Sequence, residues 1–352
     1  MGRKWMIYGA TGYTGKLIAA EAARRGLKPT LAGRNADKVR AVAEPYGFDW
    51  TAFQVDDREA AEAALNGHDA VLSVAGPFSH TAKHMIDACL KSGCHYLDVT
   101  GEFAVFEHAA SQDNAAKNAG IALIPGVGFD VVPSDCLAAH TAARVKNPVA
   151  LRIAIDALSS MSQGTAKTGV ETLGIGSLTR EEGEYIARPM GDLRRTFDLG
   201  NGPKEFFTVS WGDIATAYYS THIGNIEVYF PYSGEIKSMA RLARLLAPLL
   251  RKPWFQNFLK RRIDKQPAGP SEEERAHTHS TLMAEVDGAD GQTVRSRLTT
   301  PNGYSLTADS AVTCVEKLLA GDTLRGYHTP STAFGAELIK DIKGCTLEDL
   351  PA

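Results

Sequence analysis

Short apolar runs alternate with segments of helical periodicity over the first 130 residues. The runs have the length and composition of strands at 4–8, 29–33, 50–55, 69–74, 95–99 and 121–125. The segments between them begin at N-cap residues such as Asn35 and Asp57, and glycines stand where they would end, at Gly67, Gly93 and Gly120. Strands separated by helices pair in parallel, with helices on both faces of the sheet. The pattern predicts a doubly wound parallel sheet.

A different pattern, alternation of apolar and polar residues, dominates after residue 134. It indicates strands at 150–156, 205–211, 216–221, 225–230, 278–286 and 292–299. Such alternation is typical of antiparallel strands that bury one face. Helical periodicity is found between and after these strands, at 165–174, 236–262, 307–320 and 330–340. This half of the chain is therefore predicted to be an α+β domain with a mostly antiparallel sheet.

The length of the chain agrees with this division. With 352 residues the chain exceeds the size at which one hydrophobic core usually suffices. We predict a nucleotide-binding α/β domain at 1–133, an antiparallel-sheet domain for the substrate at 134–306, and C-terminal helices at 307–352 that pack back on the first domain.

Three glycines spaced three apart follow the first apolar strand and open an alanine-rich helix. They belong to the segment Gly9-Ala10-Thr11-Gly12-Tyr13-Thr14-Gly15. Glycine allows the tight turn from strand to helix and lets backbone N–H groups approach a diphosphate without a Cβ atom in the way. The helix also directs its positive N-terminal end at the phosphates. Because the whole strand-turn-helix context is present, the segment predicts a Rossmann-type dinucleotide site.

The end of the second strand indicates which dinucleotide binds. An NAD site usually has an acidic residue about 20 positions after the glycines, yet residues 22–36 contain no Asp or Glu. Arg34, Asn35 and Lys38 stand there instead. A guanidinium group can bind a 2′-phosphate through two hydrogen bonds, so NADP is the predicted cofactor. The alternative is that Arg34 is a solvated residue at a helix start that Asn35 caps.

Other segments at the carboxyl ends of the predicted strands are expected to border the cofactor, because ligands of doubly wound sheets bind there. They include Asp56, Ala75-Gly76-Pro77-Phe78 and Gly101. The segments 98–102 and 125–130 lie at the last two strand ends and are expected to close the nicotinamide pocket. Each of these residues also has an alternative role in an ordinary turn.

Candidate catalytic residues lie in the second half of the chain. The polar cluster around Asp213 is denser than a sheet face requires, and Tyr218 or His222 within it is a possible proton donor. Structural pairing across strands is the alternative for each. We expect no metal site, because His277 and His279 lack a third ligand nearby. No YxxxK, GxSxG, HExxH or GxxxxGK[ST] motif occurs, which argues against short-chain dehydrogenase, hydrolase, zinc protease and phosphoryl-transfer chemistry.

Composition places the chain among ordinary intracellular proteins. Its formal net charge is −3, and its five cysteines have no CxxC spacing, which favours free thiols in a reducing compartment. We expect neither a signal peptide nor a spanning helix, and we predict a cytoplasmic location.

One segment departs from this balance. Residues 232–265 hold nine basic and two acidic residues around an apolar helical stripe. The stretch 236–262 is therefore a possible contact with the inner face of a membrane or with a carrier protein. The alternative is a helix that covers the domain and has a solvated basic face. Nucleic acid is not an expected partner, because nothing else in the chain forms a basic surface.

Taken together, the chain resembles the saccharopine dehydrogenase-like oxidoreductases, in particular the branch of trans-acting enoyl reductases. The matching segments are the glycine turn 9–15, Ala32-Gly33-Arg34-Asn35, 96–102, 128–130 with 133–135, 211–213 through 225–229, and 329–335. The resemblance implies a Rossmann domain followed by an antiparallel-sheet domain, with NADPH as the reductant.

The resemblance also implies a reaction, the reduction of an activated C=C bond in a small-molecule or carrier-bound lipid-like or polyketide-like substrate. It does not supply a proton donor. Two alternatives stay open, a saccharopine-type C=N reductase of an amino-acid adduct and a non-catalytic protein that senses NADP. We also expect a homo-oligomer.

Overall fold

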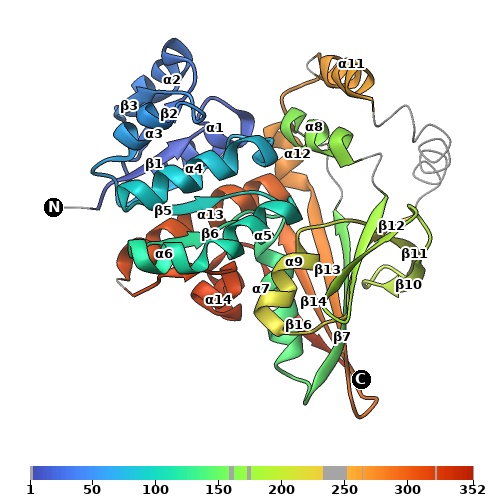
Figure 1. The fold of residues 1–352 in the computed structure, drawn as a ribbon. Helices are drawn as coiled ribbons and strands as arrows, with labels where there is room; N and C mark the ends of the chain where they lie inside the picture. The colour runs from blue at the N-terminus through green and yellow to red at the C-terminus, as the bar shows by residue number, and fades with distance from the viewer. Residues whose placement is uncertain are drawn as a thin grey trace. The chain divides into compact units, whose positions relative to one another are not determined.

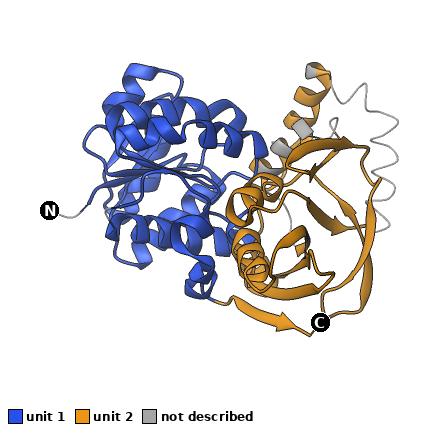
Figure 2. Ribbon diagram, turned by 60° about the horizontal axis from the view of Figure 1, so that its bottom comes forward, with its two compact units in different colours: residues 1–132, 303–343 blue, residues 133–302, 344–352 orange. Residues whose placement is uncertain are grey.

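The computed structural model describes residues 3–157, 162–172, 176–232, 252–263, 265–321 and 323–351. The chain divides into two compact units (Figure 2). Unit 1 consists of residues 1–132 and 303–343, and unit 2 of residues 133–302 and 344–352. Each unit therefore contains a segment from the C-terminal part of the chain.

The sheet of unit 1 is parallel and has seven strands in the order β15-β6-β5-β4-β1-β2-β3. Figure 1 labels β1, β2, β3, β5 and β6 of this sheet. Its strands are β1 (Trp5–Tyr8), β2 (Thr30–Gly33), β3 (Trp50–Ala52), β4 (Ala70–Ser73), β5 (His95–Asp98), β6 (Ala122–Ile124) and β15 (Gly326–Tyr327). The first six confirm the predicted strands. The seventh was not predicted, because a two-residue strand has no recognisable hydrophobic pattern.

Helices cover both faces of this sheet (Figure 2). They are α1 (Tyr13–Arg24), α2 (Ala36–Ala43), α3 (Arg58–Leu65), α4 (Phe78–Ser92), α5 (Phe103–Ser111), α6 (Asp113–Ala119), α13 (Gly303–Ala320) and α14 (Pro330–Phe334). The central strands β1 and β4 are buried along their whole length, and Met6 and Tyr8 of β1 share a core cluster with Leu65 of α3 and Met85 of α4. The edge strand β3 is exposed at Trp50 and Ala52.

The C-terminal helix α13 packs against α1. Arg25, at the end of α1, forms ion pairs with Glu21, Asp309 and Glu316, the last at 2.6 Å. Two of these partners belong to α13, so the sequence-distant helix is fixed to the Rossmann unit by charge as well as by packing.

Unit 2 is built on a mixed sheet of nine strands in the order β10-β11-β12-β7-β13-β14-β16, with β8 and β9 forming a hairpin beside β12. Its strands are β7 (Pro148–Ala157), β8 (Ser177–Glu181), β9 (Glu184–Arg188), β10 (Arg194–Asp198), β11 (Pro203–Thr208), β12 (Ile226–Pro231), β13 (His279–Gly288), β14 (Thr293–Pro301) and β16 (Thr346–Leu350). The pair β7–β12 is parallel, and the other pairings among these described strands are antiparallel. The mostly antiparallel sheet is therefore confirmed.

Two predictions about unit 2 are wrong. Residues 216–221 form part of the helix α9 (Asp213–Thr221) and not a strand. Their short alternation is ambiguous, while the acidic residue in the first turn and the alanines favour a helix. The C-terminal residues 344–352 do not stay with the helices before them, because β16 pairs with β14 and so joins the sheet of unit 2.

The other helices that the structure describes in unit 2 are α7 (Val132–Ala142), α8 (Gln163–Thr172), α11 (Pro253–Ile263) and α12 (Glu272–His277). α8 lies where the helix 165–174 was predicted. The basic stretch 236–262 falls largely outside the described residues, and only its end, from residue 252, is described. Within the described ranges, no helix has the length and apolarity needed to span a bilayer.

Candidate functional site

The glycine turn after β1 depends on the absence of side chains. Gly9 has a left-handed φ of +91°, and its N–H donates to the carbonyl of Ala32 in β2 at 2.9 Å. A Cβ atom on Gly15 would lie 2.4 Å from the carbonyl oxygen of Gly9, so α1 can pass this close to the turn only with glycine there. The N–H of Gly12 donates to the same carbonyl at 3.1 Å.

The N-terminus of α1 has no side-chain cap at Gly12, which is exposed. Neighbouring helices differ: Asn35 accepts a hydrogen bond from the backbone of Lys38 in α2, and Asp57 caps α3 in the same way. Uncapped N-terminal amides beside a glycine are the donors that bind a diphosphate, so this turn fits the predicted cofactor.

The other residues of the turn differ in how far they are exposed. Ala10 is buried, whereas Thr11 and Thr14 are partly exposed. The ring of Tyr13 meets Tyr304 edge to face at 5.2 Å, which joins the start of α1 to α13.

The strand order places the predicted cofactor residues around one position. β1 lies between β2 and β4, at the switch point where the order reverses and where such sheets bind dinucleotides. Arg34 follows β2 and is exposed, as are Lys38 in the first turn of α2 and Asp56 after β3. Tyr8 at the end of β1 has a pKa raised by burial, and the charges of Arg34 and Asp56 also act on it.

On the other side of the switch point, the segment Ala75-Gly76-Pro77-Phe78 links β4 to α4. Thr81 donates to the carbonyl of Ala75 at 2.7 Å. The carboxylate of Glu102 accepts from the N–H groups of Phe78 and Ser79, both at 2.8 Å, and so caps α4. Local sequence gave no sign of this cap, because its acceptor comes from 24 residues further along the chain.

Asp98, at the end of β5, holds together the loops after β5 and β6. Its buried carboxylate accepts from the N–H groups of Thr100 and Gly126, both at 2.9 Å, and from the hydroxyl of Tyr96 at 2.5 Å. Burial raises its pKa to about 6, although these hydrogen bonds act in the opposite direction. The sequence placed Asp98 near the nicotinamide but did not reveal this bracing role.

Asp130, in the loop after β6, is another carboxyl group of unit 1 whose pKa is raised. Burial and the nearby charge of Glu102 raise its pKa to about 7. A Cβ atom on Gly101 would lie 2.9 Å from its Oδ2 atom, so Gly101 gives this carboxyl group room. A carboxyl group with such a pKa is partly protonated near neutral pH and can donate a proton.

We expect Asp130→Asn to stabilise unit 1 at high pH. A carboxyl group whose pKa is higher in the folded state favours folding less as the pH rises from its unfolded value near 4 to about 7. Asparagine removes this penalty, so the variant should exceed the wild type by about 1–3 kcal/mol at about pH 8, and by less at about pH 5. Urea unfolding at both pH values measures the difference.

Asp37→Asn is the matched control, because the Asp37 side chain is 86% exposed. It should show no such dependence on pH. If Asp130→Asn is no more stable than the wild type at about pH 8, the raised pKa of Asp130 is contradicted.

In unit 2 the three catalytic candidates lie on the helix α9 or at its end, in different surroundings. Asp213 is completely buried at the start of α9. His222 is exposed and ends the helix in a left-handed conformation with φ of +59°. The ring of Tyr218 lies under the guanidinium group of Arg180, 3.9 Å from ring centroid to Cζ. The proposed role of each in proton transfer stays a prediction.

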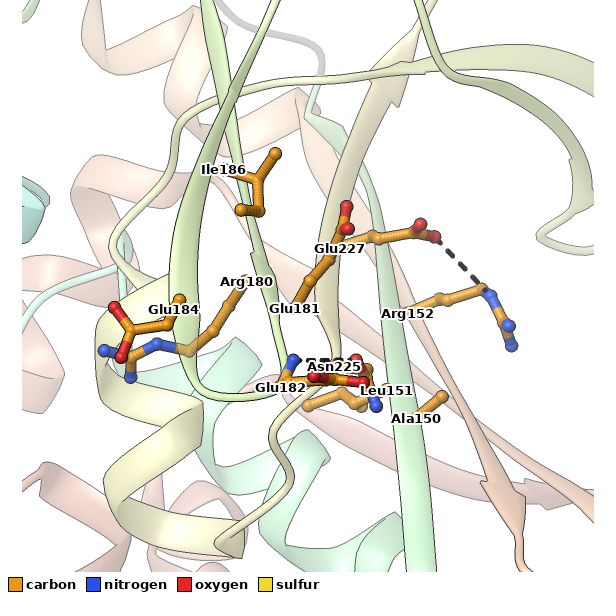
Figure 3. A pocket seen from close by; sticks show the side chains of 10 residues that line it. All are labelled: Ala150, Leu151, Arg152, Arg180, Glu181, Glu182, Glu184, Ile186, Asn225 and Glu227. Atoms are coloured by element: carbon orange, nitrogen blue, oxygen red, sulfur yellow. Dashed lines mark hydrogen bonds and ion pairs between the residues drawn. The ribbon is translucent and has the colours of Figure 1, made fainter.

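Arg180 also lines a pocket within unit 2, of about 580 Å³, beside the β8–β9 hairpin (Figure 3). Four glutamates and two arginines carry the charges of its lining: Glu181, Glu182, Glu184, Glu227, Arg152 and Arg180. The Nε atom of Arg152 lies 3.5 Å from Oε2 of Glu227, and its Nη1 atom lies 2.6 Å from Oδ2 of Asp287. The pocket thus carries more negative than positive groups, and Tyr218 is the catalytic candidate next to it.

No cluster of three or more His, Cys, Asp or Glu side chains suited to a metal ion occurs among the described residues.

These features define a two-unit protein whose first unit is a Rossmann-type dinucleotide-binding unit. Residues 5–124 match the family model of the saccharopine dehydrogenase NADP binding domain. This part of the chain is therefore an NADP binding domain of the saccharopine dehydrogenase type, and NADP is confirmed as its class of cofactor.

Curated relatives carry the name trans-acting enoyl reductase. The protein from Mycobacterium tuberculosis is 33% identical over 138 residues, which cover 37% of this chain and 33% of that protein. The protein from Mycobacterium ulcerans is 30% identical over 143 residues, 38% of this chain and 34% of that protein. The chain thus spans about a third of the length of these curated relatives.

Among solved structures, the apo saccharopine dehydrogenase (L-Glu forming) from Saccharomyces cerevisiae matches with a TM-score of 0.67. The match covers 99% of this chain and 100% of that chain at 13% sequence identity. At this identity the likeness shows the fold, and it confirms the predicted fold class.

Proposed function

We propose that the protein is an NADPH-dependent oxidoreductase that reduces the activated C=C bond of an enoyl group in a lipid-like or polyketide-like substrate. The observation that supports the cofactor is the uncapped N-terminus of α1 at Gly12. It lies at the same switch point of the sheet as the exposed Arg34. The reaction is supported by the relatives named trans-acting enoyl reductase.

Each part of unit 1 has a role in this function. The amides of the glycine turn bind the diphosphate, and Arg34 with Lys38 binds the 2′-phosphate. When bound, NADPH supplies a hydride. Asp98 and Glu102 hold the loops after β4, β5 and β6 in place through hydrogen bonds to backbone N–H groups. The proton that completes the reduction comes from an acid, for which Asp130 joins Tyr218 and His222 as a candidate.

The charges of unit 2 favour an enoyl substrate over an amino-acid adduct. A saccharopine-like substrate carries several carboxylates and requires several convergent Arg or Lys side chains. The pocket of unit 2 instead has four glutamates against two arginines, and Arg152 is already engaged by Asp287. An uncharged or carrier-bound acyl chain meets no such repulsion.

We expect Arg34→Ala to weaken NADPH binding by about 1.5–3 kcal/mol, roughly 10- to 150-fold, because a charge-assisted pair to the 2′-phosphate is lost. NADH binding should hardly change. Fluorescence titration of the purified variants with both dinucleotides measures this. Arg40→Ala is a control on the helix α2, which starts two residues after Arg34; Arg40 is 51% exposed and pairs with Asp37. Equal or tighter binding of NADH by the wild-type protein would refute the role of Arg34.

The reaction itself is tested by following NADPH oxidation with a panel of enoyl thioesters, free and carrier-bound, and with amino-acid imines. Turnover of an enoyl thioester supports the proposal, whereas turnover of imines alone assigns the C=N chemistry. Tight NADPH binding with no oxidation by any panel member would favour the sensor.

Five cysteines without a disulfide among the described residues support the proposed cytoplasmic location. A homo-oligomer remains part of the proposal, and light scattering on the purified protein tests it.

A further inference from the structure

The helix α11 of unit 2 has one face made of large aromatic and basic side chains. Trp254, Asn257, Phe258, Arg261 and Arg262 are exposed and recur at the spacing of a single helix face. Trp254 is 62% exposed and Phe258 48%, the two highest values among the exposed large hydrophobic residues of the described chain. Two large aromatic side chains exposed together are uncommon on a face that meets only water.

The opposite face of α11 is turned inward. Its residues are partly buried, namely Phe255, Gln256, Leu259, Lys260 and Ile263, and α11 packs against α8. The helix is therefore held by the body of unit 2 through one face, while Trp254 and Phe258 lie on the other. Covering α8 does not require the exposed aromatic residues.

Charge on this helix has a single sign. Residues 252–263 include Lys252, Lys260, Arg261 and Arg262 and no acidic residue, although the whole chain has a net charge of −3. The guanidinium group of Arg262 lies 5.3 Å from the centre of the Phe258 ring, so charge and aromatic surface form one patch. The complement of this patch is an anionic surface into which rings can insert.

We propose that this outward face of α11, residues 254, 257, 258, 261 and 262 with Lys252, docks unit 2 on an anionic lipid membrane. Trp254 and Phe258 enter the boundary between head groups and acyl chains, where aromatic side chains are favoured. The basic residues meet the negative head groups. The face would deliver the protein to the surface on which membrane-borne acyl chains reside. The docking itself does not depend on the proposed reaction, because its test measures binding without turnover.

The test is co-sedimentation of the full chain with vesicles of phosphatidylcholine, with and without phosphatidylglycerol, at low and high salt. We expect binding only to the anionic vesicles, and weaker binding at high salt because ions screen the basic groups. Trp254→Ala with Phe258→Ala should lower vesicle partition roughly tenfold or more, and Arg261→Glu with Arg262→Glu should abolish it.

Two control variants match these changes. Trp50→Ala removes an aromatic side chain that is 40% exposed in unit 1. Arg58→Glu with Lys83→Glu reverses two exposed charges of unit 1, whose side chains are 75% and 66% exposed. Both controls should bind vesicles nearly as well as the wild type, and circular dichroism confirms that every variant is folded.

Three outcomes would overturn the proposal. They are absence of binding to anionic vesicles at low salt, equal losses in the α11 variants and the unit 1 controls, and binding that ignores the lipid charge. Saturable binding of an isolated acidic acyl carrier protein that requires Trp254, without vesicle binding, would assign the face to a protein partner instead.

Discussion

Gly15→Ala should destabilise unit 1 by about 3 kcal/mol or more and abolish NADPH binding. The added Cβ atom would lie 2.4 Å from the carbonyl oxygen of Gly9 and 2.8 Å from the Cα atom of Ala10. Both neighbours are backbone atoms, so no side chain can rotate away to relieve the overlap. The helix α1 must then move away from the glycine turn, and its N-terminal amides move with it. Thermal unfolding and NADPH titration measure the two losses.

Gly12→Ala is the matched comparison three residues earlier. Its Cβ atom would lie 3.4 Å from the carbonyl oxygen of Gly9, and Gly12 has an ordinary φ of −73°. We therefore expect a change in unfolding free energy within about 0.5 kcal/mol. NADPH binding should still weaken roughly tenfold or more, because a methyl group stands where the diphosphate approaches the amides. Normal binding by a folded Gly12→Ala protein would mean that the diphosphate lies elsewhere.

The sequence was sufficient to predict the Rossmann unit because its signals are local. β1, β4 and β6 are buried along their whole length, β2 and β5 are buried at three of four positions, and several helices begin or end at a residue with a clear cap role. Asn35 and Asp57 cap their helices as predicted, and Gly67, Gly93 and Gly120 all have positive φ. The residues expected around the dinucleotide follow directly from these strand ends.

What the sequence missed depends on residues far apart in the chain. Glu102 caps α4 from a loop 24 residues later, and β16 joins its sheet from the end of the chain. Neither the cap nor the strand pairing has a local sequence pattern, because each depends on a partner that lies far away in the chain. The strands β8, β9 and β10 were missed for another reason. All three are short. β9 and β10 are largely exposed or partly buried, and the buried residues of β8 include the polar Ser177, Thr179 and Arg180, so the apolar pattern of these strands is weak.

The charged row across the sheet of unit 2 is a further long-range feature. Glu285 of β13 stands opposite Arg295 of β14 on one side and Arg152 of β7 on the other, and Arg152 stands opposite Glu227 of β12. The four strands thus present alternating charges in one line. Arg195 of β10 adds a third guanidinium group to Glu285, at 2.5 Å. Nothing in the separate strands indicates that their charges meet.

Glu285 is the centre of this row, because its side chain is 4% exposed and lies within ion-pair distance of three arginines. Removing Glu285 takes away the buried carboxylate that three guanidinium groups share, although Arg152 keeps Glu227 and Asp287. Removing one partner of buried ion pairs costs more than the pair itself contributes. We expect Glu285→Ala to destabilise unit 2 by about 3–5 kcal/mol, measured by urea unfolding. Glu348→Ala is the control, since Glu348 is 49% exposed and pairs with Arg297, and it should cost less than about 1 kcal/mol.

A second substitution at Glu285 tests whether the row supports the pocket. Arg152 and Glu227 belong both to the charged row and to the pocket lining, so a loss of Glu285 frees Arg152 to change its partners. If the pocket receives part of the substrate, Glu285→Gln, which keeps the shape of the side chain, should raise KM for an enoyl thioester while NADPH affinity stays constant. An unchanged KM for the enoyl thioester would contradict this role and leave the row a purely structural element of unit 2.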